Sequence, residues 1–398
     1  MGIATGSALA SEVLQIELGE FPFMVPRLSH RACVCHNSGM MEQSPASEIQ
    51  LPALSTEALV NLIKSWNQPA YRAQQILDWR NKGETDPDAM GNIPNALKDL
   101  LKANVVCQPL RLVRREVSND GTRKYVFALK RHRFEGKMVE SVFIPEERRG
   151  TVCISSQIGC VLDCPFCHTG TQAFEANLSA GEIIAQILAI KSDLQSDPLP
   201  EGLHGQVTHI VYMGMGEPLA NESALHESLS ALMSEDGLNI SRRRITVSTS
   251  GLVPQIKRLG ELHPVNLAIS LHAASDMLRD ILVPINRKYP LAQLRQCLDA
   301  YPLATQRHLT LEYVLLAGVN DREEDLQALA SFVNPERERV NLIQFNPYPG
   351  SPYRGSSKEH MRKFGQSLIL KDIRATVRRS RGQDIMAACG QLKAETQT

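Results

Sequence analysis

Six short apolar segments in the second half of the chain alternate with segments of helical periodicity, and this alternation constrains the fold most strongly. Each apolar segment ends in polar residues, and most are followed by a helical pattern such as residues 179–194. Strands separated by helices predict a parallel sheet with crossover connections. Six such units predict an α/β fold with an open, partial (β/α)6 barrel, whose active site lies at the strand ends. The expected strands are residues 151–155, 207–214, 244–250, 265–272, 309–316 and 339–346.

The chain upstream of the barrel has other periodicities. Residues 51–104 contain short amphipathic patterns, which predict a small helical module. Residues 105–150 change to strand patterns around a hairpin turn at Asn119, which predicts a short β extension. Residues 1–50 show neither period, and we expect them to be poorly ordered. The barrel and its C-terminal cysteine segment then occupy residues 151–398.

The cysteine content and the lack of long apolar segments indicate the compartment. No stretch of 18 apolar residues occurs, and the N-terminus lacks a basic segment followed by an apolar core. Nine cysteines are an odd number for a disulfide scaffold and fit a reducing compartment better. We therefore expect a cytoplasmic protein that has metal-bound or reactive thiols and no membrane partner.

The distribution of charge leaves room for an RNA partner. The formal net charge is zero, but residues 101–150 hold 12 Lys and Arg against 6 Asp and Glu. Residues 351–398 hold 10 against 4. Such segments by themselves more often form a solvated surface, and the triplet Arg242–Arg244 is equally open to both interpretations. RNA binding becomes the favoured interpretation only together with the chemistry predicted below.

Three cysteines, Cys160, Cys164 and Cys167, lie in one expected loop directly after the first strand of the barrel. Three thiolates at this spacing converge on a single object, whereas ferredoxins and closed zinc sites use four ligands. We expect one [4Fe-4S] cluster with an open iron that binds S-adenosylmethionine (SAM), from which an electron releases a 5′-deoxyadenosyl radical. The alternatives are a zinc site completed by His168 and a ferredoxin-like electron carrier.

The spacing Cys-x3-Cys-x2-Cys after the first barrel strand resembles the radical-SAM superfamily. Further segments resemble the RlmN/Cfr group of adenosine methyltransferases, and its RlmN branch most. The resemblance covers about residues 55–393. The segments that carry it are VCISSQIGCVLDCPFCHTGTQ, YMGMGEPL, RRRITVSTSG, ISLHA, VPIN, NPYPG and DIMAACGQL.

The resemblance implies methylation of C2 of an adenosine in the peptidyl-transferase region of 23S rRNA and of the adenosine 3′ of the anticodon in tRNAs. C2 lies between two ring nitrogens and is electron-poor, so it cannot attack a SAM methyl group and needs a carbon radical. Two SAM are consumed per turnover, through a methylated cysteine and a transient protein–RNA crosslink. The target base must leave its stack, which favours adenosines in loops.

The resemblance also implies roles for single residues. Cys389 matches the cysteine that is methylated, Cys153 the thiol that releases the product as a disulfide, and Glu140 the general base. The basic segments 111–133 and 374–381 are candidate phosphate contacts. The residues that match SAM-contacting positions are Gly216, Glu217, Ser248, Ser270, Leu271, His272 and Asn346.

The implied partners are a flavodoxin-like, low-potential electron donor and a thiol reductant for the Cys153–Cys389 disulfide, and we expect a monomer. Three alternative functions remain open from the sequence. The first is C8 methylation of adenosine in 23S rRNA, as in Cfr-type resistance enzymes. The second is a radical-SAM activase, which would need neither Cys153 nor Cys389. The third is a zinc-dependent RNA-binding module.

Overall fold

The computed structural model describes residues 48–394. The expectation for residues 1–50 falls almost wholly outside this range. Of those residues only 48–50 are described, and Gln50 pairs with Val106 in an isolated bridge. Among the described residues, no helix combines the length and the apolar composition that crossing a membrane requires.

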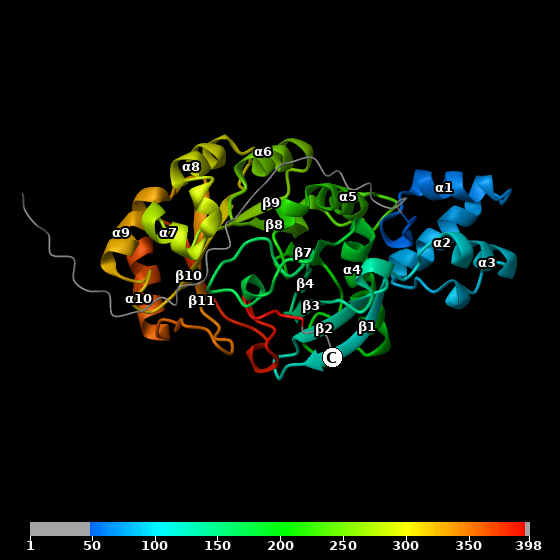
Figure 1. Ribbon diagram of the computed structural model, residues 1–398, viewed down its shortest axis with the longest axis horizontal. Coiled ribbons are helices and arrows are strands. Elements are labelled where there is room, and N and C mark those ends of the chain that lie inside the picture. The colour runs from blue at the N-terminus through cyan, green and yellow to red at the C-terminus, as the bar shows by residue number, and fades with distance from the viewer. Residues whose placement is uncertain (1–47, 395–398) are drawn as a thin grey trace, which may run out of the picture. The chain divides into compact units, whose positions relative to one another are not determined.

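Within residues 48–394, one sheet of ten strands has the order β1-β2-β3-β4-β7-β8-β9-β10-β11-β12. Neighbours from β4 to β12 are parallel, whereas β1 to β4 are antiparallel to one another. The predicted α/β class and partial barrel are confirmed (Figure 1). The strands are β1 (Leu110–Val117), β2 (Arg123–Leu129), β3 (Met138–Pro145), β4 (Gly150–Cys153), β7 (His209–Tyr212), β8 (Ile245–Thr249), β9 (Asn266–Ser270), β10 (Leu309–Leu315), β11 (Glu338–Gln344) and β12 (Ala375–Arg378).

The sheet contains all six predicted barrel strands and one parallel strand more, β12. Its first residue, Ala375, pairs with Val340 of β11. None of its four residues is buried, so this edge strand lacks the apolar pattern by which the others were predicted. For this reason residues 374–381 were interpreted only as a basic segment.

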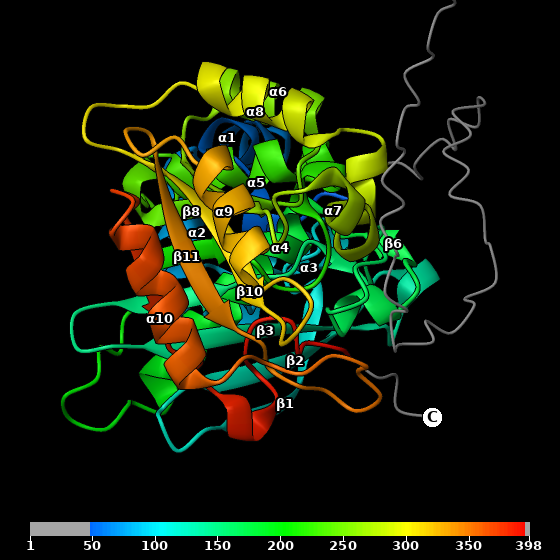
Figure 2. The same cartoon turned by 90° about the vertical axis from the view of Figure 1, so that its left-hand side faces the viewer.

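The helices cover the outer side of the parallel strands. Figure 2 shows α6, α8 and α10 outside β10 and β11. The longest helix, α4, begins with a capping box between Ser179 and Glu182 and contacts both the sheet and α2, which explains why most of its residues are buried. These helices are α4 (Ala180–Ser196), α5 (Glu222–Met233), α6 (Val253–Leu262), α7 (Asp276–Leu282), α8 (Leu291–Ala300), α9 (Glu323–Phe332) and α10 (Lys358–Ile369).

Three helices, α1 (Thr56–Ser65), α2 (Tyr71–Lys82) and α3 (Asn95–Asn104), form the N-terminal module around an apolar core of their own. Ser55 accepts a hydrogen bond from Ala58 N and caps α1. Leu59, Ile76 and Leu97 are fully buried between the helices. The amphipathic patterns of the sequence thus correspond to real apolar faces.

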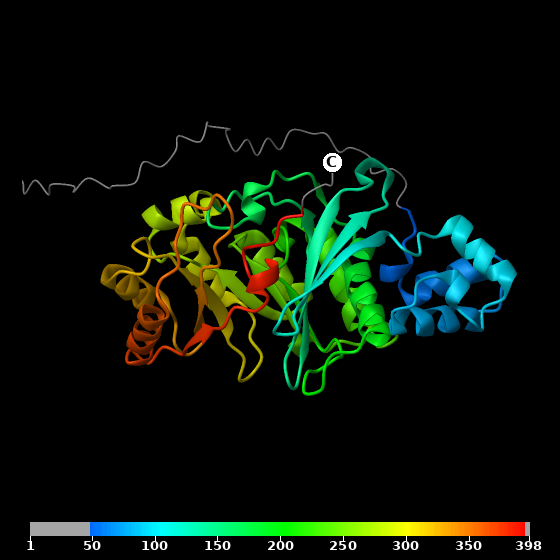
Figure 3. The ribbon, with the colours of Figure 1, turned by 90° about the horizontal axis from the view of Figure 1, so that it is seen from below.

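Two irregular segments lie at the C-terminal ends of the parallel strands. The first follows β4 and is closed by the short pair β5 (Gln157–Ile158) and β6 (Ala176–Asn177). The second, residues 379–394, is called the Cys389 segment below. Figure 3 shows this segment, drawn in red, between β1–β3 and the parallel strands. Together with the strand ends, these two segments surround the candidate site.

Candidate active site

A cavity of about 200 Å³ opens where the parallel strands end. Five of the seven described cysteines line it: Cys153, Cys160, Cys164, Cys167 and Cys389. The other two, Cys107 and Cys297, are buried in apolar cores, as expected for structural cysteines. Of the other predicted site residues, Gly216, Glu217, Ser248, Ser270, His272 and Asn346 line the same cavity, whereas Leu271 and Glu140 do not.

The loop that carries Cys160, Cys164 and Cys167 is held by close backbone packing. A Cβ atom on Gly170 would lie 2.6 Å from the carbonyl oxygen of Cys164. Gly159 has a φ of +72°, and a Cβ there would lie 2.1 Å from the carbonyl oxygen of Ala173. Both positions therefore require glycine. The three thiols are consequently presented from a compact loop rather than from a regular element.

The three thiols fit a multinuclear cluster. Burial raises the pKa of Cys160 to about 12 and that of Cys164 well above its ordinary value, and it also raises the pKa of Cys167. Buried thiols become thiolates when a cationic centre binds them. Within residues 48–394, no three His, Cys, Asp or Glu side chains have the arrangement that a single metal ion needs. The assignment of the three thiols to an iron–sulfur cluster, rather than to a zinc site with His168, stays a prediction.

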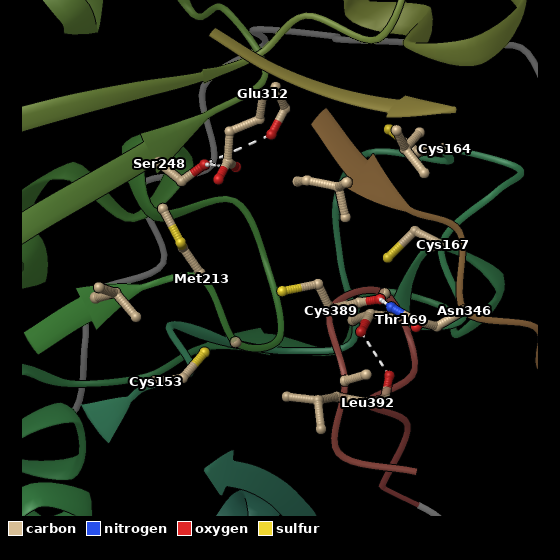
Figure 4. Close-up of a pocket in the computed structure, with 18 of the residues that line it drawn as sticks. Cys153, Cys164, Cys167, Thr169, Met213, Ser248, Glu312, Asn346, Cys389 and Leu392 are labelled. Carbon is tan, nitrogen blue, oxygen red and sulfur yellow. Dashed lines mark hydrogen bonds between the residues drawn. The ribbon is translucent and has the colours of Figure 1, made fainter. Parts of the chain in front are cut away.

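Cys153 and Cys389 approach the cavity from opposite sides (Figure 4). Cys153 ends β4, where it pairs with Val142 of β3, and is 7% exposed. Burial, and next the neighbouring Cys389, raise the pKa of Cys153 to about 12. Cys389 is exposed and lies in an irregular part of its segment. Two cysteines far apart in the sequence thus face one space.

Gly216 and Glu217 form the end of the segment that follows β7. Gly216 has a φ of +96°, and a Cβ there would lie 2.5 Å from Cβ of Gln157, so no larger residue fits. The carboxylate of Glu217 accepts hydrogen bonds from Leu219 N at 3.1 Å and Ser250 N at 2.9 Å. Burial raises its pKa to about 7. This carboxylate lines the cavity and is available to a cationic amino group.

The ends of β8 and β9 contribute hydroxyl groups. Ser248 Oγ lies 3.5 Å from Ser270 Oγ and 3.5 Å from a carboxylate oxygen of Glu312 on β10. Glu312 is buried and lines the cavity, and burial raises its pKa. Glu312 is a charged residue inside an otherwise apolar strand, and this pattern could have identified it from the sequence.

His272 and Asn346 bind the protein backbone as well as lining the cavity. His272 has a φ of +57°, its Nδ1 accepts a hydrogen bond from Val314 N at 3.1 Å, and burial lowers its pKa to about 3. Asn346 Nδ2 donates to the carbonyl oxygen of Cys389 at 3.1 Å. Asn346, a predicted SAM contact, therefore also holds the backbone of Cys389 in place.

Glu140 lies on β3 beneath the Cys389 segment and outside the cavity. Its Oε2 accepts a hydrogen bond from Lys393 N at 3.0 Å, and Lys124 Nζ lies 3.7 Å from its Oε1. Glu140 is 3% exposed, and burial raises its pKa. In this conformation Glu140 anchors the Cys389 segment, and its role as a general base stays a prediction.

The turn between β1 and β2 holds the beginning of the Cys389 segment. Asp384 accepts hydrogen bonds from Ser118 Oγ at 2.5 Å and from Asn119 N at 3.1 Å. Asp120 in turn accepts a hydrogen bond from Gly382 N at 3.1 Å. The β extension therefore helps to position Cys389. The sequence patterns alone did not predict this role.

The end of the same segment is held by residues that follow the cysteine loop. His168 N donates to the carbonyl oxygen of Gly390 at 2.8 Å, and Thr169 Oγ1 donates to that of Leu392 at 2.6 Å. The cysteine loop and the Cys389 segment are thus directly connected.

Arg378, the last residue of β12, lines the cavity. Its pKa is raised by Cys389 and, to a smaller extent, by Glu312 and Cys153. The guanidinium in turn opposes the burial that raises the pKa of Cys153. From the sequence, Arg378 was recognised only as part of the basic segment 374–381.

Comparisons with known proteins identify the family of this chain. Residues 154–330 match the model of the radical SAM superfamily. The dual-specificity RNA methyltransferase RlmN of Rhodospirillum rubrum is 43% identical over 356 residues, which cover 89% of this chain and 82% of that protein. Its counterpart from Anaeromyxobacter sp. is 44% identical and covers 88% of this chain and 92% of its own length. This chain belongs to the RlmN family.

The solved structures extend the relationship to the fold. A radical SAM methyltransferase from Sphaerobacter thermophilus is 41% identical and superimposes with a TM-score of 0.81, covering 87% of this chain and all of that one. The predicted membership of the RlmN branch of the radical-SAM superfamily is confirmed. The roles of single residues stay predictions.

Proposed function

We propose that this protein methylates C2 of an adenosine in 23S rRNA and in tRNA. The observation that carries the proposal is the convergence of Cys153 and Cys389 on the cavity that the three-cysteine loop also lines. An activase or a zinc-dependent module has no use for two further thiols there. Relatives that carry the name dual-specificity RNA methyltransferase support an RNA substrate.

The cofactors would be one [4Fe-4S] cluster, held by Cys160, Cys164 and Cys167, and SAM. Glu217 would bind the amino group of SAM, and Ser248 and Ser270 would contact its polar parts. His272 would form the same side of the SAM site, and so would the backbone of Leu271. When bound, the cluster would supply the electron that cleaves one SAM into methionine and a 5′-deoxyadenosyl radical.

Cys389 would carry the methyl group. Its thiolate would attack the methyl carbon of a first SAM and release S-adenosylhomocysteine. The methyl group on Cys389 would give one hydrogen atom to the 5′-deoxyadenosyl radical formed from a second SAM, and the methylene carbon that remains on the sulfur would bond to C2 of the adenine. The protein and the RNA are then linked through one carbon, and each turnover uses two SAM.

Release of the product would need a base and a second thiol. Glu140 would accept the C2 proton, which requires the Cys389 segment to shift, because Lys393 N now occupies its Oε2. The adduct radical would return one electron to the cluster, which SAM cleavage had left oxidised, so that the ring becomes aromatic again. The thiolate of Cys153 then attacks the Cys389 sulfur, the carbon–sulfur bond breaks, and a proton completes the methyl group. The resulting disulfide takes two electrons from a thiol reductant before the next turnover.

The remaining partners follow from the same proposal. A flavodoxin-like donor would reduce the cluster in the cytoplasm, and the protein would act as a monomer. RNA phosphates would contact exposed arginines such as Arg379 and Arg381 at the cavity and residues 111–133 of the β extension. The module of residues 51–104 would dock a further part of the RNA.

The test is digestion of the anaerobically purified protein and mass spectrometry of the peptide that contains Cys389. We expect S-methylcysteine at Cys389, and its absence in protein incubated with SAM would refute the proposed methyl carrier. The site of methylation is read from nucleosides of a deletion strain. Loss of 2-methyladenosine is expected, whereas loss of 8-methyladenosine would instead support the Cfr-type alternative.

A further inference from the structure

Arg279 on α7 is a charged residue that is completely buried, with 0% exposure. Its guanidinium donates to carbonyl oxygens at the ends of β8 and β9: Nε to Leu271 O at 3.1 Å, and Nη2 to Ser250 O at 2.6 Å and Ser270 O at 3.3 Å. The guanidinium thus joins the two strand ends that carry predicted SAM contacts. Burial of a cation is costly unless other charges compensate for it.

The nearest carboxylates compensate for this charge only indirectly. Arg279 Nη1 donates to Asn286 Oδ1 at 2.9 Å. Asn286 Nδ2 in turn donates to Asp276 Oδ1 at 2.8 Å and to Asp280 Oδ1 at 2.7 Å. One amide therefore separates the guanidinium from both carboxylates. Part of the positive charge remains available to another anion.

The cysteine loop would provide that anion once the proposed cluster is bound. Cys164 packs in one apolar cluster with Ala273, which follows β9, and with Leu282 and Val283 at the end of α7. Burial lowers the pKa of Arg279 to about 10, and Cys164 is the strongest of the groups that oppose this shift. Arg279 is consequently charged at neutral pH. Its charge lies close to a thiol that the proposed cluster would use.

We propose that Arg279 is a positioning residue for the proposed cluster: its charge raises the cluster's reduction potential, and its fork of donors holds the SAM-binding strand ends. This proposal rests on the proposed function through the cluster and through SAM binding. A cluster bound by three thiolates is anionic and gains a further negative charge on reduction. A fixed cation in a low-dielectric surrounding therefore stabilises the reduced state more than the oxidised state.

The test is a redox titration of the anaerobically reconstituted full-length protein, followed by electron paramagnetic resonance. In Arg279→Met the midpoint potential should shift to a more negative value, and in Arg279→Lys it should stay near the parent value. Asp280→Asn removes a compensating charge but keeps an acceptor for Asn286, so its potential should shift in the positive direction. The control Arg258→Met removes an exposed arginine that pairs with Glu222 and should cause no shift.

The opposite directions in which the midpoint potential shifts in Arg279→Met and Asp280→Asn distinguish an electrostatic role of Arg279 from a structural one. If Arg279→Met does not retain iron and sulfide, Asp280→Asn and Asp276→Asn still decide, because both keep the shape of the side chain. Unchanged potentials in all loaded variants would overturn the inference, whereas a parent protein that binds no cluster would instead overturn the proposed function.

The proposed role of Arg279 in holding the strand ends is tested by SAM binding to the reconstituted protein. Lysine keeps the charge but cannot donate to three carbonyl oxygens, so Arg279→Lys should bind SAM about tenfold more weakly at a nearly unchanged potential. Equal SAM affinities of parent and Arg279→Lys would contradict the positioning of the strand ends.

Discussion

The cysteine loop and the Cys389 segment are both irregular, yet they are held in place in different ways. The loop is closed by the neighbouring pair β5–β6, and Gly159 and Gly170 allow its backbone to pack on itself. The Cys389 segment depends on distant residues: Ser118 and Asp384, which bind each other, are 266 positions apart. The proposed cluster ligation is therefore a local property, whereas the position of the Cys389 thiol is a property of the whole fold. The predictions below separate these two properties.

The largest effect is expected for Cys389→Ala. Without the thiol there is no methyl acceptor, so no labelled methyl group should appear on the protein or on RNA, while iron and sulfide contents stay at the parent level. The matched control is Cys297→Ala, because Cys297 is buried in the core outside the cavity. Loss of the cluster in Cys389→Ala would show that cluster ligation depends on the Cys389 side chain.

The next effect concerns the pH dependence of product release by Cys153. Because burial raises its pKa to about 12, the thiolate fraction should rise about tenfold per pH unit below that value. The neutral thiol is favoured in the folded state, so folding loses stability once the pH exceeds the ordinary value of 9.0. The decay of the crosslink is therefore measured between neutral pH and pH 9.0.

Cys153→Ala is the control for this pH dependence. It should accumulate crosslinked RNA at every pH, since the attacking thiol is missing. A release rate in the parent protein that does not change with pH would contradict the assignment of Cys153 as the releasing thiol.

A smaller effect is expected for Asp384→Asn. The substitution keeps the shape of the side chain but weakens its hydrogen bonds with Ser118 and Asn119, because a charged acceptor becomes neutral. The level of S-methylcysteine at Cys389 should fall severalfold, with no change in cluster content. Asp236→Asn, at an exposed position, serves as control. Equal methylation in both variants would argue against anchoring by the β1–β2 turn.

The smallest effect is expected for His272→Asn. Asparagine tolerates a positive φ and can accept the hydrogen bond from Val314 N. Because burial lowers the pKa of His272 to about 3, its imidazole is neutral above pH 6 and contributes no charge to SAM binding. SAM affinity should therefore change only slightly, and equally at pH 6 and pH 8. A pH-dependent difference between variant and parent would show that His272 titrates in the bound state.

The residues that sequence reasoning missed share a physical cause. The strand β12 is an exposed edge without apolar alternation, and Glu312 stands in a strand that is otherwise apolar. Arg279 lies on a short helix of seven residues, and the fold buries it completely. Each of these residues is defined by neighbours that are distant in the chain.

The sequence by itself determined the six main barrel strands, the helical module and the loop of Cys160, Cys164 and Cys167, because periodicity and spacing depend on neighbouring residues. Only the tertiary structure decided that Cys153 and Cys389 share a cavity and that Glu140 lies outside it, beneath Lys393. These relations arise when the sheet curves and brings β3, β4 and the Cys389 segment together. No local sequence pattern predicts this arrangement, because the contacts join residues that are far apart in the chain.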